Sequence, residues 1–259
     1  MSFFQFRSTF SRNLTMTLSA FVFVILIVTI FSHKKLSGPD AVKLELPSPD
    51  WDAVTFRTAD GVRLAGWYAP SLNGAAVVML HGFGNDRRQV LPEGGILRRQ
   101  GYGVLLYDTR GHGESEGVRN GYTDAEKLDL KAALDFLATR SEVDKRRIGA
   151  YGFSMGSYIL ARQGADDARL AAFVLAGAPT SLKEIMPRLM PRPVLIIAGG
   201  LDQTVPPQDS ELLFQAAKDP KAIQTFGKAR HGEYYTSEPE RFEKMLTNFF
   251  DFTLAKKPN

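Results

Sequence analysis

The sequence predicts an α/β fold in which a mostly parallel, twisted sheet is flanked by helices. Two observations carry this prediction. Short, continuous apolar runs alternate along the chain with stretches that have the spacing of amphipathic helices. A segment of alternating polarity with a glycine-containing turn precedes them, which is typical of a β-hairpin. An apolar stretch near the amino terminus predicts one transmembrane helix ahead of this fold.

The apolar stretch LTMTLSAFVFVILIVTIF, residues 14–31, carries no charge over 18 residues and follows Arg7 and Arg12. As a helix it is roughly 27 Å long, close to the hydrocarbon thickness of a bilayer. We therefore expect residues 1–35 to form an uncleaved membrane anchor. A cleaved signal peptide is the main alternative, but its apolar region is usually shorter and ends in small residues, which TIFSHKKLSGPD lacks. A buried core helix is the third interpretation.

The two sides of the expected anchor differ little in positive charge, with a slight excess before it. This excess favours an amino terminus in the cytoplasm and a domain on the outer side of the membrane. Residues 36–50, LSGPDAVKLELPSPD, are rich in proline, serine and charge, so we expect a linker there. The folded domain is then expected over residues 51–259.

The first elements of that domain are a hairpin and a series of buried strands. Residues 51–70 alternate in polarity on both sides of Ala59-Asp60-Gly61, which predicts two antiparallel strands at the edge of the sheet. The continuous apolar runs that follow are too short for buried helices and too uniformly apolar for half-exposed strands, so we expect strands covered on both faces. These runs are residues 75–80, 102–108, 147–153, 171–177 and 193–200.

Helical spacing fills most of the intervals between these runs. The expected helices cover residues 87–100, 124–140, 157–165 and 209–218. The run KAIQTFG, residues 221–227, is expected as the last strand, and residues 238–255 as the last helix. Six apolar residues are expected near one face of that helix: Phe242, Met245, Leu246, Phe249, Phe250 and Phe252.

Composition excludes several classes of function. The chain has no cysteine, which excludes disulfides, thiolate metal sites and a cysteine nucleophile. The net charge of +4 is spread along the chain rather than clustered, so no nucleic-acid partner is expected. Histidine and carboxylate residues show no metal-ligand spacing, so neither a metal nor another cofactor is predicted.

Two serines occupy the pattern GxSxG, Ser154 in GFSMG and Ser115 in GESEG. A nucleophilic serine on an α/β fold needs a sharp turn from strand into helix, and the glycines are required because side chains there would collide. Ser154 lies between an expected strand and an expected helix. Ser115 lies well past its strand, between two glutamates whose charge would oppose an alkoxide. Ser154 is therefore the candidate nucleophile.

A serine hydroxyl needs a base, and the base needs an acid that orients it. His231 lies on the loop after the last expected strand, and Asp202 lies on the loop after residues 193–200. The order Ser154, Asp202, His231 is the one expected of a nucleophile elbow on this type of sheet. His33 lies beside the expected anchor, and His112 lies in a glycine-rich loop to which we assign a structural role.

The oxyanion of a tetrahedral intermediate needs two donors. The backbone N–H of Met155, directly after the nucleophile, is the first candidate. The second is the N–H of Phe83 in HGFGN, residues 81–85, where His81 and Gly82 would shape the loop rather than react. The pairing of His81 with Asp86 also fits an Hx4D acyltransferase pattern, which is an alternative interpretation of this segment.

Five motifs occur in order on the expected elements: HGFGN, YDTRGHGESEG, GFSMG, GGLDQTVP and RHGE. With them, residues 51–255 resemble the α/β-hydrolase superfamily, in the serine aminopeptidase or monoacylglycerol-lipase-like branch, and the expected anchor is similar to that of Bem46-like members. The resemblance implies the α/β-hydrolase fold and hydrolase activity. It also implies that the segment DTRGHGES is a structural loop.

Many of these proteins carry a long helical lid between the strands that correspond to residues 171–177 and 193–200. This chain has only APTSLKEIMPRLMPR there, about 15 residues, which predicts a minimal lid and an open site.

The sequence therefore predicts a membrane-anchored serine hydrolase that cleaves the carboxylic ester of a small-molecule acyl substrate through an acyl-enzyme. Thioesters and amides are the alternative substrate classes. The alternatives are a non-catalytic protein that binds a ligand in the same pocket, and an acyltransferase that uses the same three residues.

Overall fold

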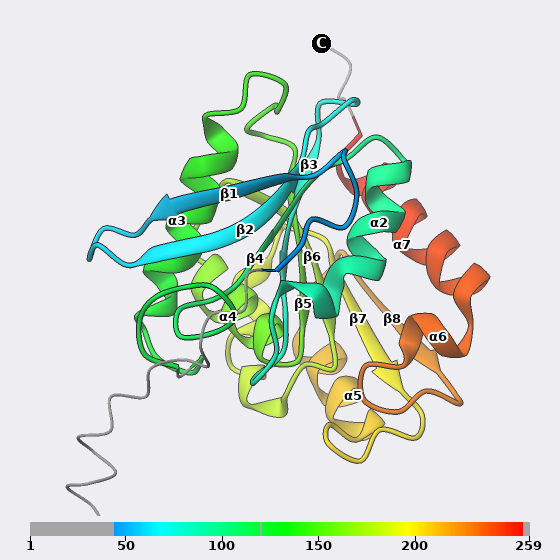
Figure 1. Ribbon diagram of the computed structural model, residues 1–259. Coiled ribbons are helices and arrows are strands. Elements are labelled where there is room, and N and C mark those ends of the chain that lie inside the picture. Colours follow the sequence, from blue (N-terminus) through cyan, green and yellow to red (C-terminus); the bar gives the residue numbers. More distant parts are fainter. Residues whose placement is uncertain (1–43, 120, 256–259) are drawn as a thin grey trace, which may run out of the picture. The chain divides into compact units, whose positions relative to one another are not determined.

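An eight-stranded sheet forms the centre of the computed structural model, which describes residues 44–119 and 121–255 (Figure 1). The strands are β1 (Asp52–Arg57), β2 (Arg63–Ala69), β3 (Ala76–Leu80), β4 (Gly103–Tyr107), β5 (Ile148–Phe153), β6 (Leu170–Ala176), β7 (Val194–Gly199) and β8 (Lys221–Phe226). Their order in the sheet is β1-β2-β4-β3-β5-β6-β7-β8. β2 is antiparallel to both β1 and β4, and all other neighbours are parallel.

The expected hairpin and parallel strands are confirmed. β1 and β2 pair from Asp52 with Tyr68 to Arg57 with Arg63, and β1 is an edge strand. Every residue of β3, β4, β5 and β7 is buried. Because both faces of these strands are buried, their sequences are continuous apolar runs. In β1, at the edge of the sheet, exposed and partly buried residues alternate along most of the strand.

Helices cover both faces of the sheet (Figure 1). They are α2 (Leu91–Arg99), α3 (Glu126–Ala138), α4 (Met155–Gly164), α5 (Pro207–Ala216), α6 (Tyr234–Ser237) and α7 (Pro239–Thr253). Ile96 of α2 and Phe250 of α7 belong to one buried cluster. Leu134 of α3, Ile159 of α4 and Leu213 of α5 belong to the other. The fold therefore has two apolar cores, one on each side of the sheet.

In the last helix, the prediction for one of the six apolar residues, Phe252, is wrong. Phe242, Leu246 and Phe250 are fully buried, and Met245 and Phe249 are partly buried against the same cluster. Phe252 is 83% exposed. Because a helix turns about 100° per residue, Phe252 lies about 200° from Phe250 and points to the opposite side.

The connection between β6 and β7 is short. It holds two 3₁₀ helices, η2 (Thr180–Leu182) and η3 (Met186–Leu189), and no lid domain is inserted in this described segment. This connection agrees with the minimal lid that the sequence predicts.

The predicted anchor, residues 1–35, and residues 36–43 of the predicted linker lie outside the described residues. Within residues 44–119 and 121–255, no helix is both long enough and apolar enough to cross a bilayer.

Candidate active site

The candidate site lies where the strand order reverses. The chain continues from β3 to β4 on one side of β3, whereas β5 lies on the other side. In open α/β sheets, ligands bind at such a point, outside the carboxyl ends of the strands. The loop 81–85 follows β3 and Ser154 follows β5. Gly82 of this loop packs against Phe153, the residue before Ser154, because a Cβ at Gly82 would lie 3.1 Å from the Phe153 ring.

Ser154 occupies a strained turn between β5 and α4. Its φ and ψ are 52° and −112°, and among the described residues it is the one non-glycine with a positive φ. Such backbone strain is typical of functional sites. A Cβ at Gly152 would lie 2.5 Å from the Gly156 carbonyl carbon, and a Cβ at Gly156 would lie 2.7 Å from the Leu80 carbonyl carbon. The predicted strand-to-helix turn is therefore present, and its packing requires both glycines.

Ser115, the other serine of a GxSxG pattern, is hydrogen-bonded to two backbone groups. Its hydroxyl donates to the Asp108 carbonyl at 2.6 Å and accepts from the Ala65 N–H at 2.9 Å. These bonds tie the loop after β4 to β2. The choice of Ser154 over Ser115 agrees with this geometry.

Asp202 and His231 lie on adjacent loops and are hydrogen-bonded to each other. The His231 Nδ1 is 2.7 Å from the Asp202 Oδ2. The loops are joined by the Gly200 N–H, which donates to the Phe226 carbonyl at 2.8 Å, and by the Leu201 N–H, which donates to the Ala229 carbonyl at 3.0 Å. The base and the acid predicted from the sequence are thus brought together.

Three further donors surround the Asp202 carboxylate. Oδ1 accepts from the Thr204 and Val205 N–H groups, both at 2.8 Å, and Oδ2 accepts from the Tyr234 hydroxyl at 3.3 Å. Burial raises the pKa of the Tyr234 hydroxyl, so it stays protonated and can donate. These donors hold the buried carboxylate in place beside His231. Sequence reasoning missed Tyr234, because it lies on the short helix α6 and no local pattern marks its target.

The imidazole of His231 lies beside the Ser154 turn. Its ring centroid is 4.7 Å from that of Phe153, and its Cε1 would lie 2.9 Å from a Cβ built at Gly177. The Ser154 N–H in turn donates to the Ala176 carbonyl at 2.8 Å. Within the described part of the chain, no hydrogen bond joins the Ser154 hydroxyl to His231. Such contacts are often long in ligand-free sites and tighten on substrate binding.

His81 holds the loop after β3. Its Nε2 accepts from the Thr109 N–H at 3.2 Å, which leaves Nδ1 to donate to the Gly82 carbonyl at 2.8 Å. Burial lowers the pKa of His81 to about 4, so the ring is neutral near pH 7 and keeps this tautomer. The Gly82 N–H donates to the Gln89 Oε1 at 2.8 Å. Nothing in the sequence pattern marked Gln89 or Thr109 as partners.

These bonds set the direction of the Phe83 N–H. The Gly82 carbonyl and the Phe83 N–H belong to one trans peptide unit, so they point in opposite directions. Because His81 holds the carbonyl on one side, the N–H faces the other. Met155 is the first residue of α4, where backbone N–H groups have no partner inside the helix and the helix dipole favours negative charge.

The remaining histidine candidate and the Hx4D pair make contacts that hold their loops. The Nδ1 of His112 lies 3.0 Å from the Thr109 Oγ1 and 3.1 Å from the Arg110 carbonyl, and its ring packs against that of His81. Asp86 caps η1 (Arg87–Val90) and pairs with Arg88, whereas the His81 nitrogens bind backbone groups. Across the described residues, no group of three or more carboxylate or imidazole side chains could hold a metal ion.

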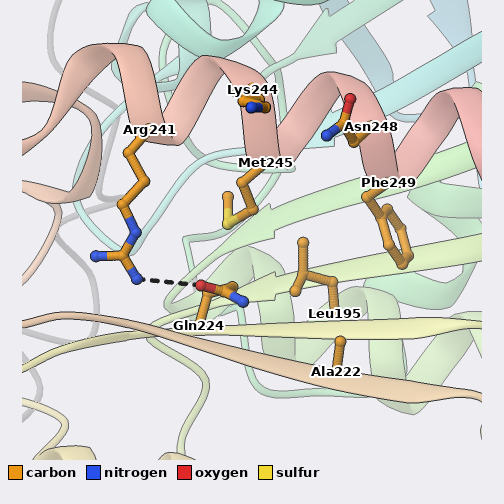
Figure 2. A pocket seen from close by; sticks show the side chains of 8 residues that line it. All are labelled: Leu195, Ala222, Gln224, Arg241, Lys244, Met245, Asn248 and Phe249. Atoms are coloured by element: carbon orange, nitrogen blue, oxygen red, sulfur yellow. Dashed lines mark hydrogen bonds between the residues drawn. The ribbon is translucent and has the colours of Figure 1, made fainter.

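A separate groove of about 360 Å³ lies between α7 and the β7–β8 edge of the sheet (Figure 2). Leu195 and Ala222 form its floor near the starts of these strands, and the side chain of Arg241 reaches across to Gln224. The residues that line it are Leu195, Ala222, Gln224, Arg241, Lys244, Met245, Asn248 and Phe249. None of the predicted site residues belongs to this groove.

Comparison with known proteins identifies relatives. The family model described as serine aminopeptidase, S33, matches residues 73–192, which include Phe83, Ser154 and Met155. The uncharacterized protein Rv2307c of Mycobacterium tuberculosis (strain ATCC 25618 / H37Rv) is 35% identical over 193 residues, covering 65% of this chain and 68% of the relative. The thiohydrolase aneE of Aspergillus aculeatus is 30% identical over 213 residues, covering 77% of this chain and 65% of that protein.

A solved structure has the same fold. The esterase Pf2001 of Pyrococcus furiosus superimposes with a TM-score of 0.72 at 24% identity, covering 79% of this chain and 93% of that structure. The family match, the relatives and the shared fold agree with the strained serine turn at the carboxyl end of β5. The chain is a serine hydrolase of the α/β-hydrolase superfamily.

Proposed function

We propose that this hydrolase cleaves a carboxylic ester through an acyl-enzyme formed on Ser154, with His231 as general base and Asp202 as its orienting acid. The observation that carries the proposal is the strained Ser154 turn, packed through Phe153 against the His231 ring that bonds to Asp202. A nucleophile, a base beside it and an acid behind the base are the parts that acyl transfer to a serine requires.

In the proposed reaction, the Ser154 Oγ attacks the ester carbonyl carbon while its proton passes to the His231 Nε2. The imidazolium that forms is held by the Asp202 carboxylate through the bond to Nδ1. Its proton then passes to the leaving alkoxide oxygen as the carbon–oxygen bond breaks, which releases an alcohol. Water attacks the acyl-enzyme with the same base, and this step releases the carboxylic acid and restores Ser154.

We also propose the N–H groups of Phe83 and Met155 as the donors to the oxyanion. The bond from His81 to the Gly82 carbonyl supports the orientation of the first donor. The position of Met155 at the start of α4 supports the second, because the partial positive charge of the helix end stabilises an oxyanion.

A thioester or an amide would be attacked by the same serine, and a relative described as a thiohydrolase makes the thioester worth testing. The leaving groups separate the substrates, because an amine needs protonation by His231 far more than a thiolate does. Matched ester, thioester and amide substrates with one acyl group would rank them.

The test of this function uses the full chain, a fluorophosphonate probe and 4-nitrophenyl acetate. Wild type should be labelled and should hydrolyse the ester, and Ser154→Ala should lose both. Ser115→Ala is the matched control, because it alters the other GxSxG serine, and it should remain labelled. Labelling and turnover that persist in Ser154→Ala would refute the assignment of Ser154 as nucleophile.

Two other outcomes would identify the alternative functions. Tight ligand binding without turnover would indicate a non-catalytic binding protein, and acyl transfer to added alcohols that is faster than hydrolysis would indicate an acyltransferase.

We further propose that residues 1–35 anchor the hydrolase in a membrane, with the hydrolase domain on the outer side. The uncharged run over residues 14–31 and the slight excess of positive charge before it support this topology. A reporter active only outside the cytoplasm, fused to the carboxyl terminus, should be active. Release of a shortened, soluble chain would instead support a cleaved signal peptide.

A further inference from the structure

Three aromatic side chains form a row that starts beside the Ser154 turn. The ring centroids of Phe83 and Tyr122 are 6.4 Å apart, and those of Tyr122 and Tyr158 are 5.0 Å apart. Phe83 is 54% exposed, Tyr122 is 48% exposed, and Tyr158 is half-buried. Large apolar side chains that are exposed next to one another, rather than singly, are typical of ligand-binding or protein-interaction surfaces.

The row is attached to the parts that are proposed to act on the substrate. Tyr158 lies one turn after Ser154 on α4, and its N–H donates to the Ser154 carbonyl at 3.1 Å. Phe83 carries a proposed oxyanion donor on its own backbone. Gly121, directly before Tyr122, packs so closely on Met155 that a Cβ would overlap the Met155 side chain. A group bound on the three rings is therefore within reach of the carbonyl that Ser154 attacks.

The geometry of the tetrahedral intermediate decides which part of the substrate lies there. Its carbon bears the Ser154 oxygen, the oxyanion, the leaving group and the acyl side chain. The leaving group must face His231, which protonates it, and the His231 ring packs on Phe153 rather than on this row. The oxyanion faces the N–H groups of Phe83 and Met155. The acyl side chain is the substituent left to extend along the rings.

We propose that the row formed by Phe83, Tyr122 and Tyr158 binds the acyl side chain of the substrate and selects esters of aromatic or other bulky apolar carboxylic acids. The inference rests on the proposed function of Ser154. Aromatic rings hold another ring by offset or edge-on contact and hold an alkyl chain by dispersion. An acetyl group is too short to cover the row, so it gains little from these contacts.

The experiment varies the acyl group at a constant leaving group. The full-length chain is assayed with the 4-nitrophenyl esters of acetic, benzoic and octanoic acid, and each kcat/KM is divided by that for the acetate. Tyr122→Ala should lower the benzoate ratio about 10-fold, the size expected for loss of one apolar contact in a binding site. Tyr122→Phe, which keeps the ring and loses the hydroxyl, should retain the wild-type ratio.

A matched control comes from the other end of the fold. Phe252→Ala removes an exposed ring on α7 and should change neither the ratios nor the turnover of the acetate. Thermal unfolding of each variant separates loss of fold from loss of selectivity.

Each outcome assigns or rejects the site. A fall in the benzoate ratio alone identifies an aryl acid as the acyl group, and a fall in both ratios identifies any bulky apolar acyl group. If Tyr122→Ala lowered kcat/KM equally for all three esters, the rings would contact the common nitrophenyl group. That result would overturn the inference, while the proposed function would stand. Absence of turnover of every ester by wild type would reject the proposed function itself.

Discussion

At the scale of single residues, His81 fixes a backbone donor that belongs to another residue. Its Nδ1–H holds the Gly82 carbonyl, and the shared peptide unit then turns the Phe83 N–H toward the proposed oxyanion position. In His81→Leu this bond is lost, and we expect kcat for an ester to fall about 100-fold with little change in KM, as for loss of an oxyanion donor.

His81→Asn is the matched variant for that measurement. Asparagine carries an N–H near the position of Nδ1, so most of kcat should return. Both variants remove the acceptor for the Thr109 N–H, so their difference isolates the bond to Gly82. Equal losses of kcat in the two variants would show that His81 only fills space.

The burial of Glu93 predicts that the stability of the fold depends on pH. The side chain is buried in α2 and its Oε1 accepts from the Tyr151 hydroxyl at 3.3 Å. Its Oε2 has no hydrogen-bond partner among the residues that the structure describes. Burial raises its pKa from 4.5 to about 7. The folded state therefore binds a proton that the unfolded state releases between these values, so the stabilising contribution is complete below pH 4.5 and is lost as the pH rises toward 7.

Glu93→Gln removes this titration. The free energy of unfolding of the variant minus that of wild type should be larger at pH 8 than at pH 4. The increase should be on the order of 3 kcal/mol for such a pKa shift. Urea denaturation at both pH values gives the difference, in which the other titrating groups cancel. The same difference at pH 4 and pH 8 would contradict a raised pKa.

The sequence predicts the residues of the candidate site better than it predicts their supports. Ser154, Asp202 and His231 each follow a strand that the sequence predicts, so their order along the chain could be compared with that of a serine triad. Tyr234 and Gln89 act through side chains from other elements, on Asp202 and on Gly82. No local periodicity specifies such partners, because the contact depends on how separate loops approach in space.

At the scale of elements, the start of α4 is pressed against the end of β3. A Cβ at Gly156 would lie 2.7 Å from the Leu80 carbonyl carbon. Because that atom belongs to the backbone of β3, it cannot move away without displacing the strand. Gly156→Ala should lower the free energy of unfolding by about 1–3 kcal/mol, as overpacking does. It should also lower ester turnover, because the displaced helix carries Met155 and follows Ser154.

Gly95 in α2 gives the control, since it is also a helical glycine. A Cβ there meets only the Arg99 side chain, at 3.7 Å. Gly95→Ala should therefore raise the free energy of unfolding by about 0.5–1 kcal/mol through helix propensity. Opposite signs for the two substitutions in urea denaturation are the expected result, and a loss of similar size in both would contradict the packing argument.

The elements themselves were predictable where burial is uniform. Strands covered on both faces, such as β3 and β7, read as apolar runs, and the glycine-containing turn marked the hairpin. The four-residue helix α6 has no room for a periodic pattern, so it was missed. Phe252 was misplaced because six apolar residues over 242–252 span more of the helix than one buried face can hold.

At the scale of the whole molecule, the short β6–β7 connection leaves the candidate site without an inserted lid. A lid that opens at a lipid surface gives lipases a sudden rise in activity when their substrate passes its solubility limit. Here two 3₁₀ helices, η2 and η3, occupy that place, and Phe83 is already exposed. We therefore expect the rate of tributyrin hydrolysis by the full-length chain to follow a smooth saturation curve through the solubility limit. A jump of 10-fold or more at that limit would contradict this expectation, and a lidded lipase assayed in parallel is the positive control, because its rate must jump under the same conditions.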